Sequence, residues 1–409
     1  MAVVGEAASA AGTGADPSRI LIVNAGSSSL KLRVLAVDDT LVASADLPAP
    51  RGSADASAVA DAVAGFGAIR AVGHRIVHGG TRYRDPVLLD DEVERHLRAL
   101  TDLAPLHQPK SLAALAAVRA VLPDVPAVAC LDNAFHADMP PTATTYAIPR
   151  EWRTRWALRK YGFHGLSHAY ASRRAAAMVG RSVEALRIVT CHLGAGASLA
   201  AIRGGRSVDT TMGFTPLDGL VMATRSGSID PGLLLWLEEH VGMPPGELAA
   251  TLEYRSGLLG LAGTADMRMI LAAEATGDEA AALAIGVYLH RLLASVAAMV
   301  VALGGLDVLV FTGGVGEHAP AIREQVGRAL TFLGVAVDTA SNDAVHGDAD
   351  ISVVGAAVRT LVIVAREDLE IARQVRAVLG LSGPPSATRP GRQERERASS
   401  PPRSPRQVT

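Results

Sequence analysis

Lysine is nearly absent from this chain of 409 residues. Lys31, Lys110 and Lys160 are the only lysines, so almost all of the 39 basic residues are arginines. No Gly-Lys-Ser or Gly-Lys-Thr tripeptide occurs, which excludes a Walker-type phosphate loop, and no lysine lies in the strand setting of a protein kinase. A phosphate site in this chain must therefore use arginine, backbone N–H groups and metal.

Cysteine is also scarce, and charge of one sign is not in excess. Cys130 and Cys191 each stand alone at the end of an apolar run, which is typical of small buried side chains in a reducing compartment and predicts a cytoplasmic protein. The net charge is −2, so nothing electrostatic indicates a nucleic-acid or acidic-membrane partner. The longest charge-free apolar run, 292–306, is too short to span a bilayer and predicts a buried helix followed by a buried strand at 308–311.

The two ends of the chain differ in composition from its middle. Residues 1–18 are rich in Ala and Gly, lack the basic start and apolar core of a secretory signal, and are predicted to be a disordered extension. Residues 381–409 are rich in Pro, Ser and Arg and are predicted to be a disordered tail. Folded structure is therefore expected between residues 19 and 380.

Two distant segments have the same pattern. Residues 20–35 and 186–202 each consist of an apolar strand, a Gly/Ser turn and a second alternating strand. The turns Asn24–Ser29 and His192–Ser198 carry little side-chain bulk, so their backbone N–H groups can approach a phosphate closely. One such turn is usually a plain hairpin connection. Two of them, one in each half, predict a duplicated domain with a polyanionic ligand held between the halves.

Strands and helices alternate between and after these hairpins, which predicts α/β sheets covered by helices. The predicted strands are 71–77, 127–131, 308–312 and 351–365, and the predicted helices are 91–100, 111–121, 279–303, one from Pro320, and 368–378. A turn is expected at Gly313-Gly314. The closing helix is expected to return to the first half, which gives a first domain of 19–132 with 366–380 and a second domain of 133–365.

Three charged residues are candidates for binding or catalysis. Arg75 lies in the middle of a strand, before Gly79-Gly80, where a buried guanidinium needs an anion; a core carboxylate would satisfy it as well as a ligand would. Arg225 lies in a Pro/Gly/Thr-containing loop and would suit a carboxylate or phosphoryl group in the same way. Asp132 ends a strand at the edge where open α/β sheets bind ligands, although it could also cap the next segment.

Two further segments carry candidate chemistry. His164 and His168 have the four-residue spacing of a helical metal pair, but Gly165 lies between them and no acidic partner follows, which disfavours zinc. His164 is predicted to be a donor to a phosphoryl group and His168 a packed or capping histidine. Gly313–Glu317 joins a buried strand to a helix and fits a nucleotide-binding turn. The glycines of 194–199 are no dinucleotide fingerprint, because Leu199 occupies a position that requires a small residue.

Taken together, these motifs resemble the acetate kinase family of the actin/sugar-kinase-like superfamily over residues 19–380. The shared motifs, in chain order, are VNAGSSSLK, GHRIVHGG, LAPLH, LDNAFH, YGFHGLSH, HLGAGAS, TPLDGLVMATRSG, ADMR and FTGGVGE. The resemblance implies an α/β fold of two duplicated actin-like (ribonuclease H-like) domains, each with a mixed sheet flanked by helices. It also implies a homodimer.

The resemblance implies a role for each matching position. Asn24 and Glu367 match the positions that hold Mg²⁺, with Mn²⁺ as an alternative. Arg75 and Arg225 match the arginines for the carboxylate or acyl phosphate, Asp132 the catalytic aspartate, and His164 the histidine on the transferred phosphoryl group. Val77, Leu106 and Pro216 match an apolar pocket for the acyl methyl group. The matching ATP/ADP positions are Lys31, His192, Leu193, Gly194, Ala195, Gly196, Asp266, Met267, Arg268, Gly313, Gly314, Val315, Gly316 and Glu317.

The implied reaction is reversible in-line phosphoryl transfer from Mg-ATP to acetate, which gives acetyl phosphate and ADP. Propionate or another short-chain carboxylate stays open as the acceptor, because one methylene changes binding by only about 1–3 kcal/mol. Ala195 stands where the family usually has Asn, which leaves a different phosphoryl donor open, and also a nucleotide-binding module with little catalytic activity. Gln108-Pro109-Lys110 and Asp138 are further departures from the family pattern.

Overall fold

The computed structural model describes residues 19–26, 29–49, 55–104 and 107–384. Leu106, the extension at 1–18 and all but the first four residues of the predicted tail lie outside the described residues.

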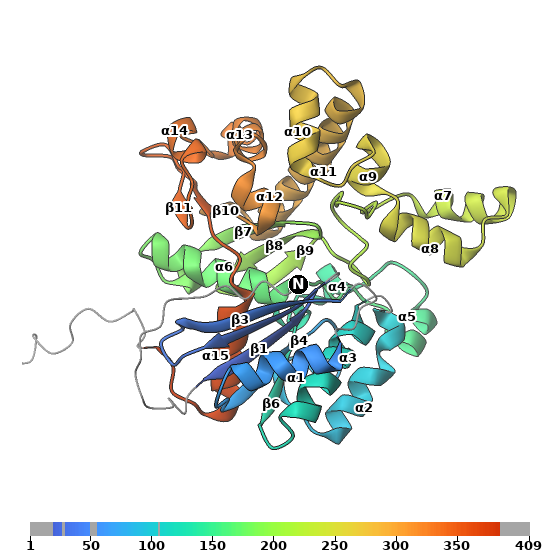
Figure 1. Cartoon of the computed structure of the whole chain (residues 1–409). Coiled ribbons are helices and arrows are strands. Elements are labelled where there is room, and N and C mark those ends of the chain that lie inside the picture. The colour runs from blue at the N-terminus through green and yellow to red at the C-terminus, as the bar shows by residue number, and fades with distance from the viewer. Residues whose placement is uncertain (1–18, 27–28, 50–54, 105–106, 385–409) are drawn as a thin grey trace, which may run out of the picture.

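Two six-stranded mixed sheets form the centre of the molecule (Figure 1). The first has the order β3-β2-β1-β4-β6-β5, with β1 Ile20–Ala25, β2 Ser29–Leu35, β3 Leu41–Pro48, β4 Ala71–Ile76, β5 Val87–Leu88 and β6 Ala127–Leu131. The second has the order β9-β8-β7-β10-β12-β11, with β7 Arg187–Leu193, β8 Ala197–Arg203, β9 Arg206–Thr210, β10 Val308–Thr312, β11 Ala349–Asp350 and β12 Arg359–Val362.

The two sheets repeat one pairing scheme. In each, the first strand of the hairpin pairs antiparallel with the second, and parallel with the next strand of the sheet. Each sheet also ends in a two-residue strand, β5 or β11, that pairs antiparallel with its neighbour. The predicted duplication is therefore present at the level of strand order and direction, while the domain boundaries themselves stay a prediction.

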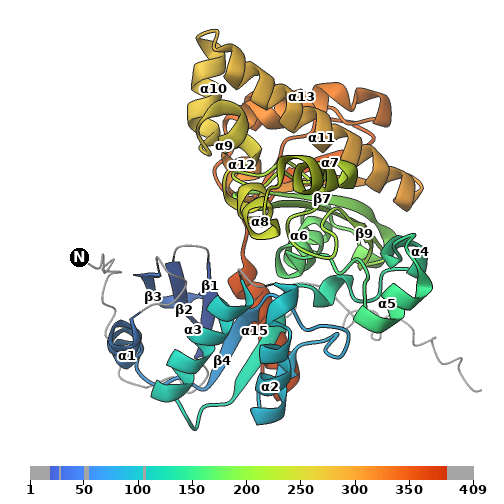
Figure 2. The same cartoon turned by 90° about the vertical axis from the view of Figure 1, so that its right-hand side faces the viewer.

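Helices cover both sheets, and Figure 2 shows the two lobes that result. The α-helices are α1 Ala56–Gly65, α2 Asp91–Ala99, α3 Gln108–Val121, α4 Pro141–Thr144, α5 Arg150–Trp156, α6 Gly165–Met178, α7 Pro231–Trp236, α8 Pro245–Tyr254, α9 Gly257–Ala262, α10 Met267–Ala275, α11 Glu279–Leu303, α12 Gly313–His318, α13 Pro320–Ala329, α14 Thr339–Asp343 and α15 Glu367–Leu379. Short 3-10 turns occupy Thr101–Leu103, Ala134–His136, Val183–Ala185 and Thr331–Leu333, and one π-helical turn, η4, occupies Leu237–Val241.

Most predicted elements are confirmed, and two are wrong. Gly313 has a φ of 79°, so this single residue turns the chain and α12 begins there, without the separate Gly-Gly turn that was expected. The predicted strand at 351–365 is largely loop. Gly355 has a φ of 83° and breaks the run, and only Arg359–Val362 pairs with β10. Apolar composition alone does not reveal where a partner strand ends.

The expected return of the closing helix to the first half is confirmed. Ile371, Ala372 and Val375 of α15 are buried in one cluster with Ile20 and Ile22 of β1. Figure 1 shows α15, in red, among the blue strands of the first sheet.

Gly73 in β4 explains how closely the helix approaches. A Cβ at Gly73 would lie 2.4 Å from Cγ2 of Ile371 and 2.8 Å from Cγ2 of Val375. The sheet can accept α15 at this distance only because residue 73 has no side chain.

Helix α11 contains the apolar run singled out in the sequence. By length and composition alone it could cross a membrane, a test that the core helix of a soluble protein also passes. Its side chains from Ala281 to Leu303 contribute one face to the large core cluster beside β8 and β10, so the predicted buried helix and strand are confirmed.

Candidate active site

Four predicted residues meet at the carboxyl ends of β1, β4 and β6. Oδ2 of Asp132 accepts hydrogen bonds from Nε of Arg75 at 3.0 Å and from Nη2 at 2.5 Å. Nη1 of Arg75 donates to Oδ1 of Asn24 at 3.1 Å, and Nδ2 of Asn24 donates to Oε2 of Glu367 at 3.1 Å. The strands bring the first three residues together, and α15 adds the fourth from the far end of the chain.

This cluster is a partly buried network of charges. Burial raises the pKa of Asp132, with Glu367 adding to the shift and Arg75 opposing it. Burial alone would lower the pKa of Arg75, but the charges of Asp132 and Glu367 outweigh it and raise that pKa. Arg75 therefore stays positive. The first alternative drawn from the sequence, a pairing with a core carboxylate, is confirmed, and the binding of an anionic ligand by Arg75 stays a prediction.

His164 lies at the start of α6, with a left-handed φ of 57°. The next residue is tightly placed, because the N–H of Gly165 donates to the carbonyl of Asp132 at 2.7 Å and a Cβ there would lie 2.2 Å from that oxygen. The ring of His164 lies against that of His192, with centroids 4.4 Å apart. Burial, followed by the charges of His192 and Arg75, holds the pKa of His164 well below its usual value, so the imidazole is neutral.

Arg225 is held in the same manner as Arg75. Its Nε lies 2.8 Å from Oε1 of Glu253, and its Nη1 donates to the carbonyl of Pro216 at 3.2 Å. Its Nη2 lies 3.2 Å from Nε2 of His107. Burial and the charge of Arg225 lower the pKa of His107 to about 3, so this ring is neutral and can accept a hydrogen bond from the guanidinium.

Gly196, in the turn of the second hairpin, lies between His164 and Arg225. A Cβ on Gly196 would lie 3.2 Å from Nε2 of His164 and 3.4 Å from Nη1 of Arg225. Nε2 of a neutral imidazole and a guanidinium therefore border the same small space, which is open because residue 196 is glycine.

Two adjoining cavities extend from this point. One, of about 500 Å³, is lined by His107, Lys110, Ala195, Ala223, Thr224, Arg225, Glu253, Tyr254, Ala265 and Asp266. The other, of about 360 Å³, is lined by Gly194, Ala195, Ala223, Leu258, Ala265, Asp266, Met267, Arg268, Leu271, Tyr288, Gly314, Val315, His318 and Ala319. Ala195, Ala223, Ala265 and Asp266 border both, so the arginine site and the second cavity adjoin.

Half of the fourteen predicted nucleotide positions line the second cavity: Gly194, Ala195, Asp266, Met267, Arg268, Gly314 and Val315. The other half do not. Leu193 is in the core and Lys31 is exposed on β2, directly opposite Asn24 in the strand pairing. The carboxylate of Glu317 is already hydrogen-bonded within the protein: its Oε1 accepts from the N–H groups of Gly313 and Ala365 at 2.8 and 2.9 Å.

The structure places the remaining predicted positions in several surroundings. His192 and Gly196 contact His164, and Gly316 is buried inside α12. Val77 is buried in the same core cluster as Phe163, and Pro216 is buried beside Arg225. Leu106 lies outside the described residues, so the three-residue acyl pocket stays a prediction.

Sequence reasoning missed three residues that the structure brings to the site: His107, Glu253 and Tyr288. Both His107 and Glu253 contact Arg225. Tyr288 lines the second cavity, and its buried hydroxyl has no hydrogen-bond partner in the described part of the chain. His107 belongs to the LAPLH motif, which was a usable signal. Glu253 and Tyr288 lie in ordinary helical sequence and gave none.

A metal site can be tested on the same cluster. Among the described residues, no group of three or more His, Cys, Asp or Glu side chains is arranged to hold an ion. Mg²⁺, however, needs few protein ligands, because waters and phosphate oxygens complete its shell. Oδ1 of Asp132 is buried without a hydrogen-bond partner, within a cluster that also offers oxygen atoms of Asn24 and Glu367. These hard oxygen donors fit a divalent cation.

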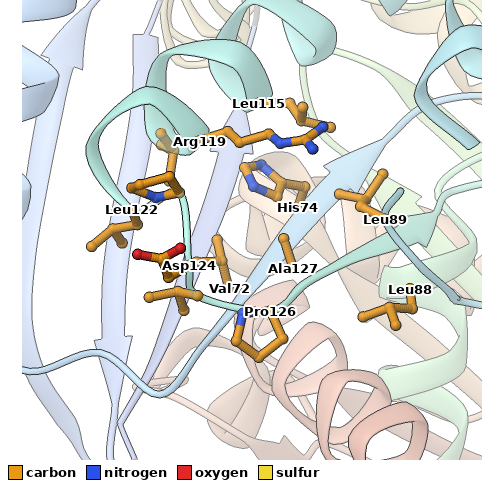
Figure 3. A pocket seen from close by; sticks show the side chains of 13 residues that line it. Val72, His74, Leu88, Leu89, Leu115, Arg119, Leu122, Asp124, Pro126 and Ala127 are labelled. Carbon is orange, nitrogen blue, oxygen red and sulfur yellow. The ribbon is translucent and has the colours of Figure 1, made fainter. Parts of the chain in front are cut away.

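A separate cavity of about 260 Å³ lies between α3 and the strands β4 to β6. Figure 3 shows Leu88 and Leu89 on one side of His74 and Leu122 with Asp124 on the other. His74 is 2% exposed, and its Nδ1 has no hydrogen-bond partner among the described residues. Burial lowers its pKa to about 3. None of the predicted site residues lines this cavity.

Comparison with known proteins agrees with this geometry. The model of the Acetokinase family matches residues 54–373, which include Arg75 and Glu367 but not Asn24. The acetate kinase of Clavibacter michiganensis is 44% identical over 386 residues, which are 87% of this chain and 98% of that protein.

Two solved structures are equally similar to the chain. An acetate kinase from Porphyromonas gingivalis and a propionate kinase from Francisella tularensis each have a TM-score of 0.81 and 34% identity, covering 88% of this chain and 100% of theirs. The predicted fold of two mixed sheets flanked by helices is confirmed. The predicted resemblance is confirmed as well, and the chain belongs to the acetokinase family.

Proposed function

We propose that this protein is an acetate kinase, which transfers the γ-phosphoryl group of Mg-ATP to acetate and reverses the reaction to make ATP. The observation that carries this proposal is the pair of partly buried, carboxylate-paired arginines, Arg75 and Arg225, whose charges both act on a neutral His164. Two guanidinium groups suit a carboxylate and the equatorial oxygens of a phosphoryl group.

The residues divide the work by charge. Acetate is an anion at neutral pH, so its oxygen needs no base to attack phosphorus. Asp132 instead fixes the orientation of Arg75, and Glu253 fixes that of Arg225. In the transition state, charge spreads over the phosphoryl oxygens, and preorganised donors such as these arginines and Nε2 of His164 stabilise it.

A divalent cation belongs to the proposal. Asn24 and Glu367, with the unpartnered Oδ1 of Asp132, would hold Mg²⁺ or Mn²⁺. When bound, such an ion neutralises phosphate charge. The protein's own part is to exclude water as the two halves close over the cavities, since water would otherwise take the phosphoryl group.

ATP is proposed to occupy the second cavity. Gly194, and Gly314 and Val315 near the start of α12, line this cavity, and so does Tyr288, whose hydroxyl has no hydrogen-bond partner among the described residues. Ala195 contributes only a methyl group between the two cavities. Donor choice is therefore the part of the proposal that most needs measurement.

The experiment is a panel of ATP, GTP and pyrophosphate against acetate, propionate and butyrate, with acyl phosphate measured as its hydroxamate. The proposal expects the highest kcat/KM for ATP with acetate, and loss of product when EDTA removes the metal. Propionate or butyrate well above acetate would overturn the acetate assignment. ATP binding without acyl phosphate from any acceptor would favour the nucleotide-binding module that Ala195 keeps open.

We also propose a cytoplasmic homodimer. Leu233, Leu235 and Trp236 of α7 and Val241 of η4 are each about half exposed, and Figure 1 shows α7 projecting from the second lobe. A cluster of exposed apolar side chains is typical of an interface. Light scattering should give twice the chain mass, and Leu235→Glu should halve it. Leu41→Glu, on the edge strand β3, is the control.

A further inference from the structure

A chain of hydrogen bonds runs from the second sheet to the back of His164. Nδ1 of His168 lies 2.7 Å from Oγ1 of Thr190, and Nε2 of His168 lies 2.8 Å from Oγ of Ser198. The same Ser198 oxygen lies 2.9 Å from Nδ1 of His164. Thr190, His168 and Ser198 are buried, so water does not compete for these groups.

Each of these four side chains can donate only one hydrogen bond within this series. Burial lowers the pKa of His168 and of His164 well below the usual value, so each ring carries one N–H and one lone pair. Ser198 contacts both rings and has one hydroxyl proton. If it accepted from both, its own buried O–H would have no acceptor among the described residues, so it donates to one ring and accepts from the other. Two directions remain, one in which protons point toward His164 and one in which they point toward Thr190.

Thr190 decides between them. Its hydroxyl has no other hydrogen-bond partner in the described segments, and it is fully buried. If protons pointed toward Thr190, its own O–H would have no acceptor, and burying an unpaired donor is costly. If they point away, Thr190 donates to Nδ1 of His168, Nε2–H of His168 donates to Ser198, and Ser198 donates to Nδ1 of His164. All three of these donors are then satisfied within the chain, and the remaining N–H, on Nε2 of His164, faces the space beside Gly196.

We infer that Thr190, His168 and Ser198 form a relay of hydrogen bonds that fixes His164 as the Nε2–H tautomer. These three are positioning residues. Because Nδ1 of His164 accepts from Ser198, the proton must sit on Nε2, the atom beside Gly196 and Arg225. A neutral ring held this way presents a donor to a phosphoryl oxygen, where the opposite tautomer would present a lone pair and repel it. The catalytic part of this inference rests on the proposed function, whereas the tautomer does not.

Neighbouring histidines have partners of their own. Nδ1 of His136 lies 2.7 Å from Oγ of Ser207 and its Nε2 3.1 Å from the carbonyl of Phe163. Nδ1 of His192 lies 2.8 Å from Oγ of Ser167. Although the ring of His136 packs against that of His168, with centroids 5.7 Å apart, its hydrogen bonds go to other groups. Ser207→Ala therefore offers a matched control, since it removes a hydroxyl from a buried histidine outside the hydrogen-bonded relay.

The direct test is ¹⁵N NMR of the full-length protein with labelled histidine, because protonated and unprotonated ring nitrogens have well-separated shifts. Signals are assigned by their loss in His164→Gln and His168→Gln. The inference expects both rings to carry the proton on Nε2 in the protein without ligands. Ser198→Ala should move His164 toward a mixture of tautomers. A proton on Nδ1 of His164 in the unsubstituted protein would overturn the inference.

Kinetics supply the second test. Ser198→Ala should lower kcat about ten- to a hundredfold with little change in the KM for acetate, since it removes two hydrogen bonds. Thr190→Val, with no contact to the site, should lower kcat about two- to tenfold, and Thr190→Ser should restore it. Equal losses for Thr190→Ser and Thr190→Val would contradict the relay. If the unsubstituted protein makes no acyl phosphate, the proposed function fails while the NMR result still decides the tautomer.

Discussion

Asp132 holds Arg75 through a single oxygen, Oδ2, which accepts from both Nε and Nη2, while Oδ1 has no hydrogen-bond partner in the part of the chain that the structure describes. One atom of the carboxylate therefore orients the guanidinium, and the other is available to a cation.

Asp132→Asn tests whether the negative charge of Asp132, rather than the shape of its side chain, is what Arg75 and the cation require. The amide is isosteric but neutral, so the Arg75 charge loses its main partner in a buried place, and the free energy of unfolding should fall by about 3 kcal/mol. Turnover should fall at least about a hundredfold, and the dependence of rate on Mg²⁺ concentration should shift to higher concentration. Urea unfolding and initial rates measure both.

The matched control is Glu324→Gln, which breaks the exposed pair between Glu324 and Arg328. It should change stability by less than about 0.5 kcal/mol. An Asp132→Asn protein with unchanged stability and turnover would remove Asp132 from the site.

Substitutions of Arg225 and Glu253 should differ in size, because Arg225 is proposed to face the phosphoryl group and Glu253 to orient Arg225. Arg225→Ala, like Arg75→Ala, should lower turnover at least about a hundredfold, because a guanidinium facing the phosphoryl oxygens is lost. Glu253→Gln keeps the arginine but loosens its orientation, so its effect should be smaller and should fall mainly on the KM for acetate. Equal losses for Arg225→Ala and Glu253→Gln would show that Glu253 does more than orient. Circular dichroism checks the fold of each variant.

Ala195→Asn tests the departure from the family at the nucleotide cavity. The methyl group of Ala195 is exposed to both cavities, so an amide there has room to contact a phosphate. One such hydrogen bond should tighten ATP binding about fivefold or more. Calorimetry with ATP measures the change, and Ala223→Asn, on the same boundary, is the comparison. No gain in affinity would mean that another group already fills this role.

The stability of the protein should fall as the pH drops below neutral. Burial lowers the pKa of His74 from 6.5 to about 3, so the folded state keeps it neutral where the unfolded chain binds a proton. The unfolded state then binds more protons, and the free energy of unfolding decreases with falling pH by about 1.4 kcal/mol per pH unit for each such histidine. His78 and His136, whose pKa values burial lowers to about 4, act in the same direction.

His74→Leu should remove the contribution of His74 to the pH dependence of the free energy of unfolding. Urea unfolding at pH 7 and pH 5 measures it, with the exposed His290→Gln as the control. Because Nδ1 of His74 has no hydrogen-bond partner among the described residues, the leucine variant should keep its stability at pH 7. A slope unchanged by His74→Leu would contradict burial as the cause.

Local patterns were enough to predict much of the fold. The alternation of apolar residues in 20–35 and 186–202 predicted both hairpins, because each hairpin depends on neighbours in sequence. The run at 351–365 misled, because a strand ends where its partner ends, and β10 is far away in sequence.

The site residues show the same contrast between local patterns and contacts that are distant in sequence. Residues in or directly after a strand and inside a recognisable motif, such as Arg75 and Asp132, could be predicted. Glu253 and Tyr288 could not be, since their importance comes from contacts with residues distant in sequence that share no pattern with them. Ser198 lies in a recognised turn, but its contacts with two histidines distant in sequence gave no signal there.

The placement of α15 has a consequence for how the protein is made. The apolar face of β1 and β4 that Ile371 and Val375 cover leaves the ribosome about 300 residues before the helix that covers it. The first sheet therefore keeps that face open until α15 has been synthesised. Glu367 arrives on the same helix, so the cluster of Asn24, Arg75 and Asp132 lacks its second carboxylate until then.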